Sequence, residues 1–170
     1  RGPLVRQLQE TMADDWYFAA GELLEGPDFF PEIESCGGVI GRGINDGPDE
    51  DFQNLQWILL GALSAAHDRV VIITPYFLPE DIFQQALQVA AMRGVRVDIV
   101  LPARSNLPYI DWASRPSWEP LLEHGCSIWL CPPPFDHSKL MVVDGRWSLF
   151  GSANWDPRSL KLNFEFNVEA

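Results

Sequence analysis

Val70-Val71-Ile72-Ile73, followed by Thr74-Pro75, is the stretch of sequence that decides the fold. The run is continuously apolar, rich in β-branched residues and too short for a helix, which indicates a β-strand buried on both faces. Strands of this kind belong to sheets that helices cover. The run therefore predicts an α/β domain.

Helical and strand patterns alternate on both sides of this strand. Apolar residues recur at helical spacing before and after it, and Gly94 and Gly125 end two of the helical patterns. The predicted elements are a helix over 52–66 preceded by the acids at 49–51, a helix over 79–93, a strand over 95–101, a helix over 118–124 and a strand over 127–130. Such alternation is typical of a largely parallel sheet covered by helices.

The two ends of the chain have different sequence patterns from the middle. Helical periodicity predicts a helix over 3–20, and the Gly-, Pro- and Glu-bearing stretch that follows indicates a linker. Further predicted strands lie at 39–44, at 140–143 and 147–150 around the hairpin turn Asp144-Gly145-Arg146, and at 163–169, where polar and apolar residues alternate. We therefore divide the chain into an entry helix and linker over 1–36 and one domain over 37–170.

The composition is that of an ordinary globular protein, with 46% hydrophobic and 21% charged residues. The net charge of -12 weighs against a protein that binds nucleic acid by neutralising its phosphates. The acidic excess lies in residues 1–51, with 12 acids against 3 bases, whereas the remainder has 12 acids against 9 bases. No nucleic-acid partner is expected.

The expected environment is reducing. Cys36, Cys126 and Cys131 have no metal-ligand spacing, which favours buried thiols in a reduced, cytosol-facing domain. No stretch reaches the roughly 20 apolar residues of a membrane-spanning helix, so we expect this piece to be soluble. Because the first residue is Arg1 rather than Met, we expect the chain to be part of a longer protein.

Chemically active side chains gather near the predicted hairpin. His137 and Lys139 are two residues apart, so on a strand they project to the same side. A neutral imidazole can attack phosphorus while an ammonium holds the phosphoryl oxygens. Ser152 and Asn154, also two apart, would bring a hydroxyl and an amide to the same oxygens.

An attacking imidazole needs an acceptor for its second nitrogen, which fixes the tautomer and stabilises the developing cation. The carboxylates near His137 in sequence are those of Asp136, Asp144, Asp156 and Glu165. We favour Glu165, which lies on a later strand with alternating polar positions.

The pattern His137-x-Lys139-x4-Asp144, followed by Gly151-Ser152-x-Asn154, resembles the signature of the phospholipase D superfamily. Other segments resemble the second half of bacterial cardiolipin synthases, so that the resemblance covers nearly the whole chain. They are Thr74-Pro75-Tyr76-Phe77-Leu78-Pro79, Trp112-Ala113-Ser114-Arg115, Glu123-His124-Gly125 and Asp156-Pro157-Arg158-Ser159 through Asn163-Phe164-Glu165; Asp14-Asp15-Trp16 resembles the end of the first half.

The resemblance implies an α/β/α sandwich whose mixed sheet is flanked by helices, here the second of two halves. Two signatures meet in one active site of this superfamily, where one histidine becomes a phosphohistidine and the other protonates the leaving alcohol. This chain has one signature. The second would come from an N-terminal half of the same protein or from a homodimer mate.

The resemblance also implies a function, phosphatidyl transfer by a cardiolipin synthase from phosphatidylglycerol, without metal or other cofactor. The parent protein would lie at the bacterial inner membrane, facing the cytoplasm or peripheral to it. Two alternatives remain: a phospholipase D or nucleic-acid phosphodiesterase with the same chemistry, and a noncatalytic half used for assembly.

Two interpretations are open for several of the site residues. Asp144 counts as catalytic through the signature, but as the first residue of a turn its carboxylate could bond only backbone amides. Tyr76 follows a buried strand at its carboxyl end, where open α/β sheets bind ligands, so it could line the site. Alternatively, it could pack in the core. Arg115 could contact phosphate or form a surface ion pair. Asp136 replaces a commonly apolar residue, and we expect it to point away from His137.

Overall fold

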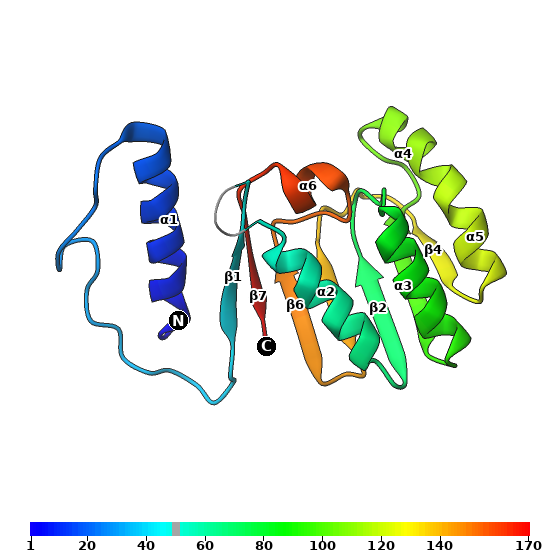
Figure 1. The fold of residues 1–170 in the computed structure, drawn as a ribbon, viewed down its shortest axis with the longest axis horizontal. Coiled ribbons are helices and arrows are strands. Elements are labelled where there is room, and N and C mark those ends of the chain that lie inside the picture. The colour runs from blue at the N-terminus through cyan, green and yellow to red at the C-terminus, as the bar shows by residue number, and fades with distance from the viewer. Residues whose placement is uncertain (49–51) are drawn as a thin grey trace.

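A computed structural model of the chain describes residues 1–48 and 52–170. Its centre is one seven-stranded sheet in the order β1-β7-β6-β5-β2-β3-β4 (Figure 1). The strands are β1 (Arg42–Asp46), β2 (Arg69–Ile73), β3 (Arg96–Pro102), β4 (Ser127–Cys131), β5 (Leu140–Val143), β6 (Trp147–Gly151) and β7 (Glu165–Glu169). The helices are α1 (Leu4–Ala20), α2 (Asn54–Ala65), α3 (Asp81–Met92), α4 (Pro108–Ser114), α5 (Trp118–Glu123) and α6 (Pro157–Lys161), with a 3-10 turn, η1 (Arg115–Ser117).

The sheet is mixed. β2, β3 and β4 pair in parallel, as expected where helices connect the strands, and every other pairing is antiparallel. The prediction of a largely parallel sheet is therefore wrong outside these three strands, because β5 enters the sheet antiparallel to β2 and each strand beyond it pairs antiparallel with its neighbour. The mixed sheet with flanking helices that the resemblance implied is confirmed.

The core lies between one face of the sheet and the helices α2, α3 and α5, which Figure 1 shows beside one another. Val70 and Ile72 point into this core and are completely buried, whereas Val71 and Ile73 point to the other face and are half-buried. The prediction that this strand is buried on both faces is therefore correct for one face only, because the other face is half-buried. The helices contribute Leu55, Leu59, Leu63, Phe83, Leu87, Ala90 and Leu121.

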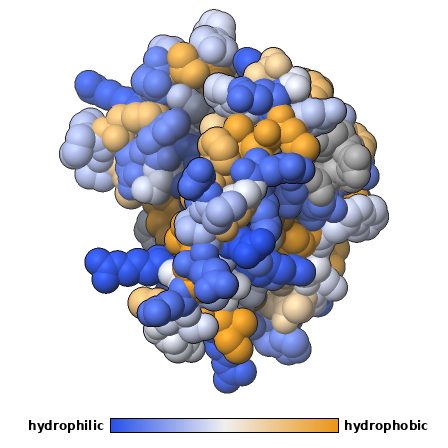
Figure 2. Space-filling view, turned by 90° about the vertical axis from the view of Figure 1, so that its left-hand side faces the viewer, coloured by the Kyte–Doolittle hydropathy of each residue, from blue (hydrophilic) through white to orange (hydrophobic). Residues whose placement is uncertain are grey.

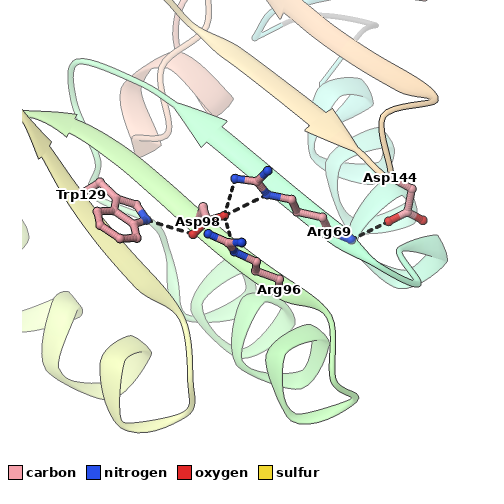
Figure 3. A network of polar contacts seen from close by, with 5 residues as sticks. All are labelled: Arg69, Arg96, Asp98, Trp129 and Asp144. Atoms are coloured by element: carbon pink, nitrogen blue, oxygen red, sulfur yellow. Dashed lines mark hydrogen bonds and ion pairs between the residues drawn. The ribbon is translucent and has the colours of Figure 1, made fainter.

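A buried carboxylate joins the three parallel strands (Figure 3). Asp98 on β3, 2% exposed, accepts hydrogen bonds from Arg69 on β2 at 2.9 Å and Trp129 on β4 at 2.9 Å, and pairs with Arg96 at 3.0 Å. Burial acts to raise the pKa of Asp98, but the bonds from Trp129 and Arg69 and the two arginine charges outweigh it, so the pKa is lowered. The carboxylate stays ionised and fixes the register of these strands.

The N-terminal segment lies against the β1 edge. Gln7 of α1 accepts a hydrogen bond from the amide of Gly43 at 2.6 Å, and every residue of α1 is at least partly exposed. Figure 2 looks onto this side of the molecule, where apolar side chains reach the surface between hydrophilic ones. β1 begins later than predicted, and Val39 and Ile40 are exposed.

Some expectations are corrected here or lie outside the structure. Cys36 and Cys131 are exposed rather than buried, and only the third thiol, Cys126, fits the prediction; burial raises its pKa to about 11. The acids predicted at the start of α2, at 49–51, lie outside the described residues. Among the helices that the structure describes, none combines the length and apolar character needed to cross a membrane.

Candidate active site

His137 and Lys139 lie side by side in the extended segment that leads into β5, not in a strand as predicted. The ammonium of Lys139 donates a hydrogen bond to the backbone carbonyl of His137 at 2.8 Å. The segment follows Pro132–Pro134, and prolines cannot donate the hydrogen bonds of a strand ladder. The backbone thus leaves the sheet before the site and returns to it after Lys139.

Two aromatic rings surround the imidazole of His137. The ring centroid of Tyr76 lies 5.7 Å away in an edge-on arrangement, and that of Phe135 lies 5.8 Å away. Partial burial and the nearby Lys139 charge lower the pKa of His137, while Asp136 acts in the opposite sense. The imidazole is therefore held in its neutral form near pH 7, the form that can act as a nucleophile.

Three carboxylates surround Lys139. Burial lowers the pKa of its ammonium, and Glu165, Asp136 and Asp156 oppose this by favouring the charged form. Asp136 itself turns back on Ser138, accepting bonds from its hydroxyl at 2.6 Å and its amide at 2.8 Å, which lower the pKa of Asp136. The site therefore combines a neutral imidazole with a partly desolvated cation.

Glu165, which favours the charged form of Lys139, is held in place by polar neighbours. The hydroxyl of Ser152 donates to Glu165, and the amide of Asn163 donates to its other oxygen at 3.0 Å. Within the described residues, no hydrogen bond joins Glu165 to His137. The predicted role as acceptor for the second ring nitrogen is thus not seen in a single chain, and it stays a prediction.

The polar face of β7 points inward. Glu165 and Asn167 are buried at 8% and 2% exposure, whereas Phe166 and Val168 are half-buried, the reverse of what the alternation suggested. Asn167 accepts a hydrogen bond from the amide of Ala153 at 3.4 Å. This strand therefore supports the Ser152 loop with polar groups.

Gly151 permits the close approach of β6 to β7. A Cβ atom there would lie 2.4 Å from both the Asn167 side-chain oxygen and the Phe166 carbonyl. Asn154, which follows in the same loop, donates to Ser159 at 3.2 Å, and its buried oxygen has no partner among the described residues. Steric crowding therefore explains why residue 151 is a glycine. The Asn154 amide lies half-buried beside the site.

Asp144 does not join the site. It lies at the opposite end of β5 from Lys139, and its carboxylate accepts hydrogen bonds from the backbone amides of His67, Asp68 and Arg69 at 3.0, 2.9 and 2.8 Å. Figure 3 shows the bond with Arg69. These bonds lower the pKa of Asp144. The structure shows the geometry of the turn alternative, a carboxylate bonded to backbone amides, and a catalytic role for Asp144 stays a prediction.

Arg115 is likewise engaged elsewhere. Its guanidinium pairs with Asp111 at 3.3 Å and lies 5.5 Å from the ring centre of Trp118. The ion-pair alternative is the one that the structure shows. A phosphate contact by Arg115 stays a prediction.

Sequence reasoning missed one residue of the site, Phe135, and one role of another, Asp156. Phe135 packs against His137, and no pattern in its flanking prolines announces that contact. Asp156 was considered as an acceptor for the imidazole but not as the N-cap of α6, where it accepts from the amides of Arg158 and Ser159 at 2.9 Å. An Asp-Pro pair is a recognisable helix start. Among the described residues, no His, Cys, Asp and Glu cluster could hold a metal ion.

Comparison with protein families identifies the domain. The family model described as "Cardiolipin synthase, PLD-like domain" matches residues 59–170, which include the whole site. The chain belongs to this family. In this PLD-like domain, His137, Lys139 and Ser152 lie on loops at one edge of the sheet, and Asp144 lies at the other end of β5.

Curated relatives agree with this membership. The PLD-like domain is 37% identical to a cardiolipin synthase of Geobacillus sp. (strain WCH70) over 99% of this chain and 38% identical to cardiolipin synthase A of Pseudomonas fluorescens (strain SBW25) over 96%. In both cases the chain spans 34% of the relative's length.

Solved structures share the fold. The phospholipase D family member Nuc from Salmonella typhimurium superposes with a TM-score of 0.64 at 24% identity, covering 76% of this chain and 82% of that one. Phosphatidylserine synthase from Haemophilus influenzae gives a TM-score of 0.59 at 22% identity, covering 76% and 34%.

Proposed function

We propose that the PLD-like domain supplies one half of the active site of a phosphatidyl transferase that makes cardiolipin and glycerol from two phosphatidylglycerol molecules. The observation that carries the proposal is the placement of His137 between the rings of Tyr76 and Phe135, with the Lys139 ammonium bonded to the His137 carbonyl at 2.8 Å. The relatives named cardiolipin synthase support the choice of substrate.

The reaction takes place in two displacements. A ring nitrogen of one signature histidine attacks phosphorus, the P–O bond to glycerol breaks, and the other histidine protonates the leaving glycerol. The hydroxyl of a second phosphatidylglycerol then attacks phosphorus, gives its proton to the second histidine and displaces the first. His137 is one of these two histidines, and Lys139 binds the phosphoryl oxygens as their charge rises. Ser152 joins it once its hydroxyl, which donates to Glu165, turns to the phosphate.

The second histidine comes from a preceding half of the same protein or from a second copy of the chain. The exposure of His137 supports this, because its own chain leaves the imidazole open to a partner. The greater length of the relatives leaves room for another half. We place the intact protein at the bacterial inner membrane, where its substrate lies.

Product analysis tests the proposal. The intact protein is incubated with phosphatidylglycerol in mixed micelles, and the products are identified by mass spectrometry. His137→Ala is compared with His124→Ala, which removes another exposed histidine outside the site. We expect cardiolipin and glycerol from the wild type and the control, and neither from His137→Ala.

Other products would contradict the proposal in distinguishable ways. Phosphatidic acid alone would mean a phospholipase. Cardiolipin synthesis by His137→Ala at the wild-type rate would mean that this half serves only for assembly. Cleavage of DNA without lipid turnover would mean a nucleic-acid phosphodiesterase, which the net charge of -12 opposes.

A further inference from the structure

We infer that Tyr109 and Trp112 of α4, together with Arg104 and Arg115, form a surface that docks on an anionic membrane beside the active site. We call these four residues the α4 surface. The inference rests on the proposed function, because it concerns how a lipid in a bilayer reaches His137.

The α4 surface exposes large amphipathic rings. Trp112 is 81% exposed and Tyr109 66% exposed, and both line an open pocket with Arg115. Tryptophan and tyrosine favour the membrane–water interface, because their rings have an apolar body and a polar group. Their exposure together on one short helix therefore fits insertion among lipid headgroups.

The charge of this segment differs from that of the chain. Residues 103–118 contain two arginines and one acid, Asp111, which pairs with Arg115 and lines the same pocket, so the segment has a net charge of +1 in a chain whose net charge is -12. Cationic side chains next to interfacial aromatic rings are attracted to anionic lipids. Exposed apolar side chains also lie on α1, within the acidic region 1–51, which an anionic membrane would repel, and on other elements, where Trp57 and Met92 are examples.

The α4 surface is continuous with the candidate active site. The loop before α4 contains Asn106, whose side-chain oxygen accepts a hydrogen bond from the Tyr76 hydroxyl at 2.8 Å. Tyr76 in turn packs edge-on against His137. In Figure 1, α4 lies at the same edge of the sheet as α6, which adjoins the site. A lipid held at α4 thus has a short path to the imidazole.

A fluorescent probe tests the docking directly. An environment-sensitive fluorophore is attached to Trp112→Cys in the intact protein carrying Cys36→Ser and Cys131→Ser, since both thiols are exposed. The matched control carries it at Trp57→Cys, an exposed position on α2. Vesicles of phosphatidylcholine with and without phosphatidylglycerol are then added. We expect a blue-shifted, brighter emission at position 112 with the anionic vesicles and no change at position 57.

Three results would overturn the inference. They are an unchanged probe at position 112, equal shifts at both positions, and a blue shift at 112 that precedes lipid and grows with protein concentration. The last would mean that a second copy of the chain covers α4.

Kinetics separate this inference from the proposed function. Tyr109→Ala/Trp112→Ala should lower turnover of phosphatidylglycerol vesicles about tenfold, equivalent to about 1.4 kcal/mol, and leave turnover of a monomeric short-chain phosphatidylglycerol unchanged. An equal loss on both substrates would overturn the docking role. A probe shift at 112 in a protein that turns over no lipid would support docking and contradict the proposed function.

Discussion

Asp144 and Arg69 are joined by a reciprocal pair of hydrogen bonds. The carboxylate of Asp144 accepts from the Arg69 amide at 2.8 Å, and the Asp144 amide donates to the Arg69 carbonyl at 2.7 Å. Asp144 adopts a positive φ of 54° at the start of the hairpin turn. The signature aspartate therefore ties the end of β5 to the start of β2, at the far end of β5 from Lys139.

Replacing Asp144 should affect stability more than chemistry. We expect Asp144→Ala to lower the thermal midpoint by several degrees, because three backbone amides lose their acceptor. Below its own midpoint the variant should keep most of its lipid turnover. Wild-type stability with abolished turnover would instead place Asp144 in the catalytic machinery.

The same residue should make stability depend on pH. The folded pKa of Asp144 is lowered from 3.8, so its stabilisation is present at neutral pH and is lost as the pH falls from that value through the folded pKa. The difference in thermal midpoint between wild type and Asp144→Ala should therefore shrink in acid. A constant difference would contradict this.

Gly151 should not tolerate a side chain. We expect Gly151→Ala to lower the free energy of unfolding by about 1–3 kcal/mol, because its Cβ would meet the backbone of β7. Gly61→Ala is the matched control, since a Cβ on this α2 residue meets nothing within 4 Å. The control should stabilise the protein by about 0.5–1 kcal/mol. Urea denaturation measures the free energy of unfolding of both variants. Equal changes in the two would contradict the steric argument for Gly151.

The pKa of His137 should respond to its two charged neighbours in opposite directions. Lys139→Met should raise the pKa of His137, because the ammonium lowers it, and Asp136→Asn should lower it further. NMR titration of the imidazole protons measures this, with His67 and His124 as internal references. Unchanged titration in both variants would contradict the arrangement described.

Lys139 should also be needed for turnover. We expect Lys139→Met to reduce kcat about 10²–10³-fold, as for the loss of a donor to a developing oxyanion. The control is Lys161→Met on α6, which removes an ion pair with Glu80 at 2.7 Å and should retain activity. A small loss in Lys139→Met would assign the phosphoryl oxygens to other donors.

Most of the fold followed from the periodicity of the sequence. The strand at 70–73 and the helices that became α2, α3 and α5 were predicted because their apolar patterns match the core that they form. The helix α1 was also predicted from its apolar spacing, although none of its residues is buried. α4 and α6 were missed, since helices of 7 and 5 residues have too few turns to show a period. α5 is equally short, with 6 residues, but Gly125 marks its end in the sequence. Strand direction was predicted correctly only where helices connect the strands.

The candidate site was predictable in composition but not in position. His137, Lys139 and Ser152 lie in one region because the loops before β5 and after β6 leave adjacent strands at the same edge. The position of Asp144 followed from the hairpin rather than from the signature, because a turn residue after the strand at 140–143 lies at the opposite end of that strand from Lys139. Phe135 reaches His137 through the bend of its segment, which has no sequence pattern.

Glycerol exchange tests the covalent two-step mechanism most directly. The intact protein is given phosphatidylglycerol and isotopically labelled glycerol, and labelled phosphatidylglycerol is followed by mass spectrometry before cardiolipin accumulates. A phosphatidyl-histidine intermediate predicts that label enters from the first time point in wild type and His124→Ala, and that His137→Ala abolishes it. Cardiolipin formation without early exchange, or exchange that persists in His137→Ala, would contradict the account.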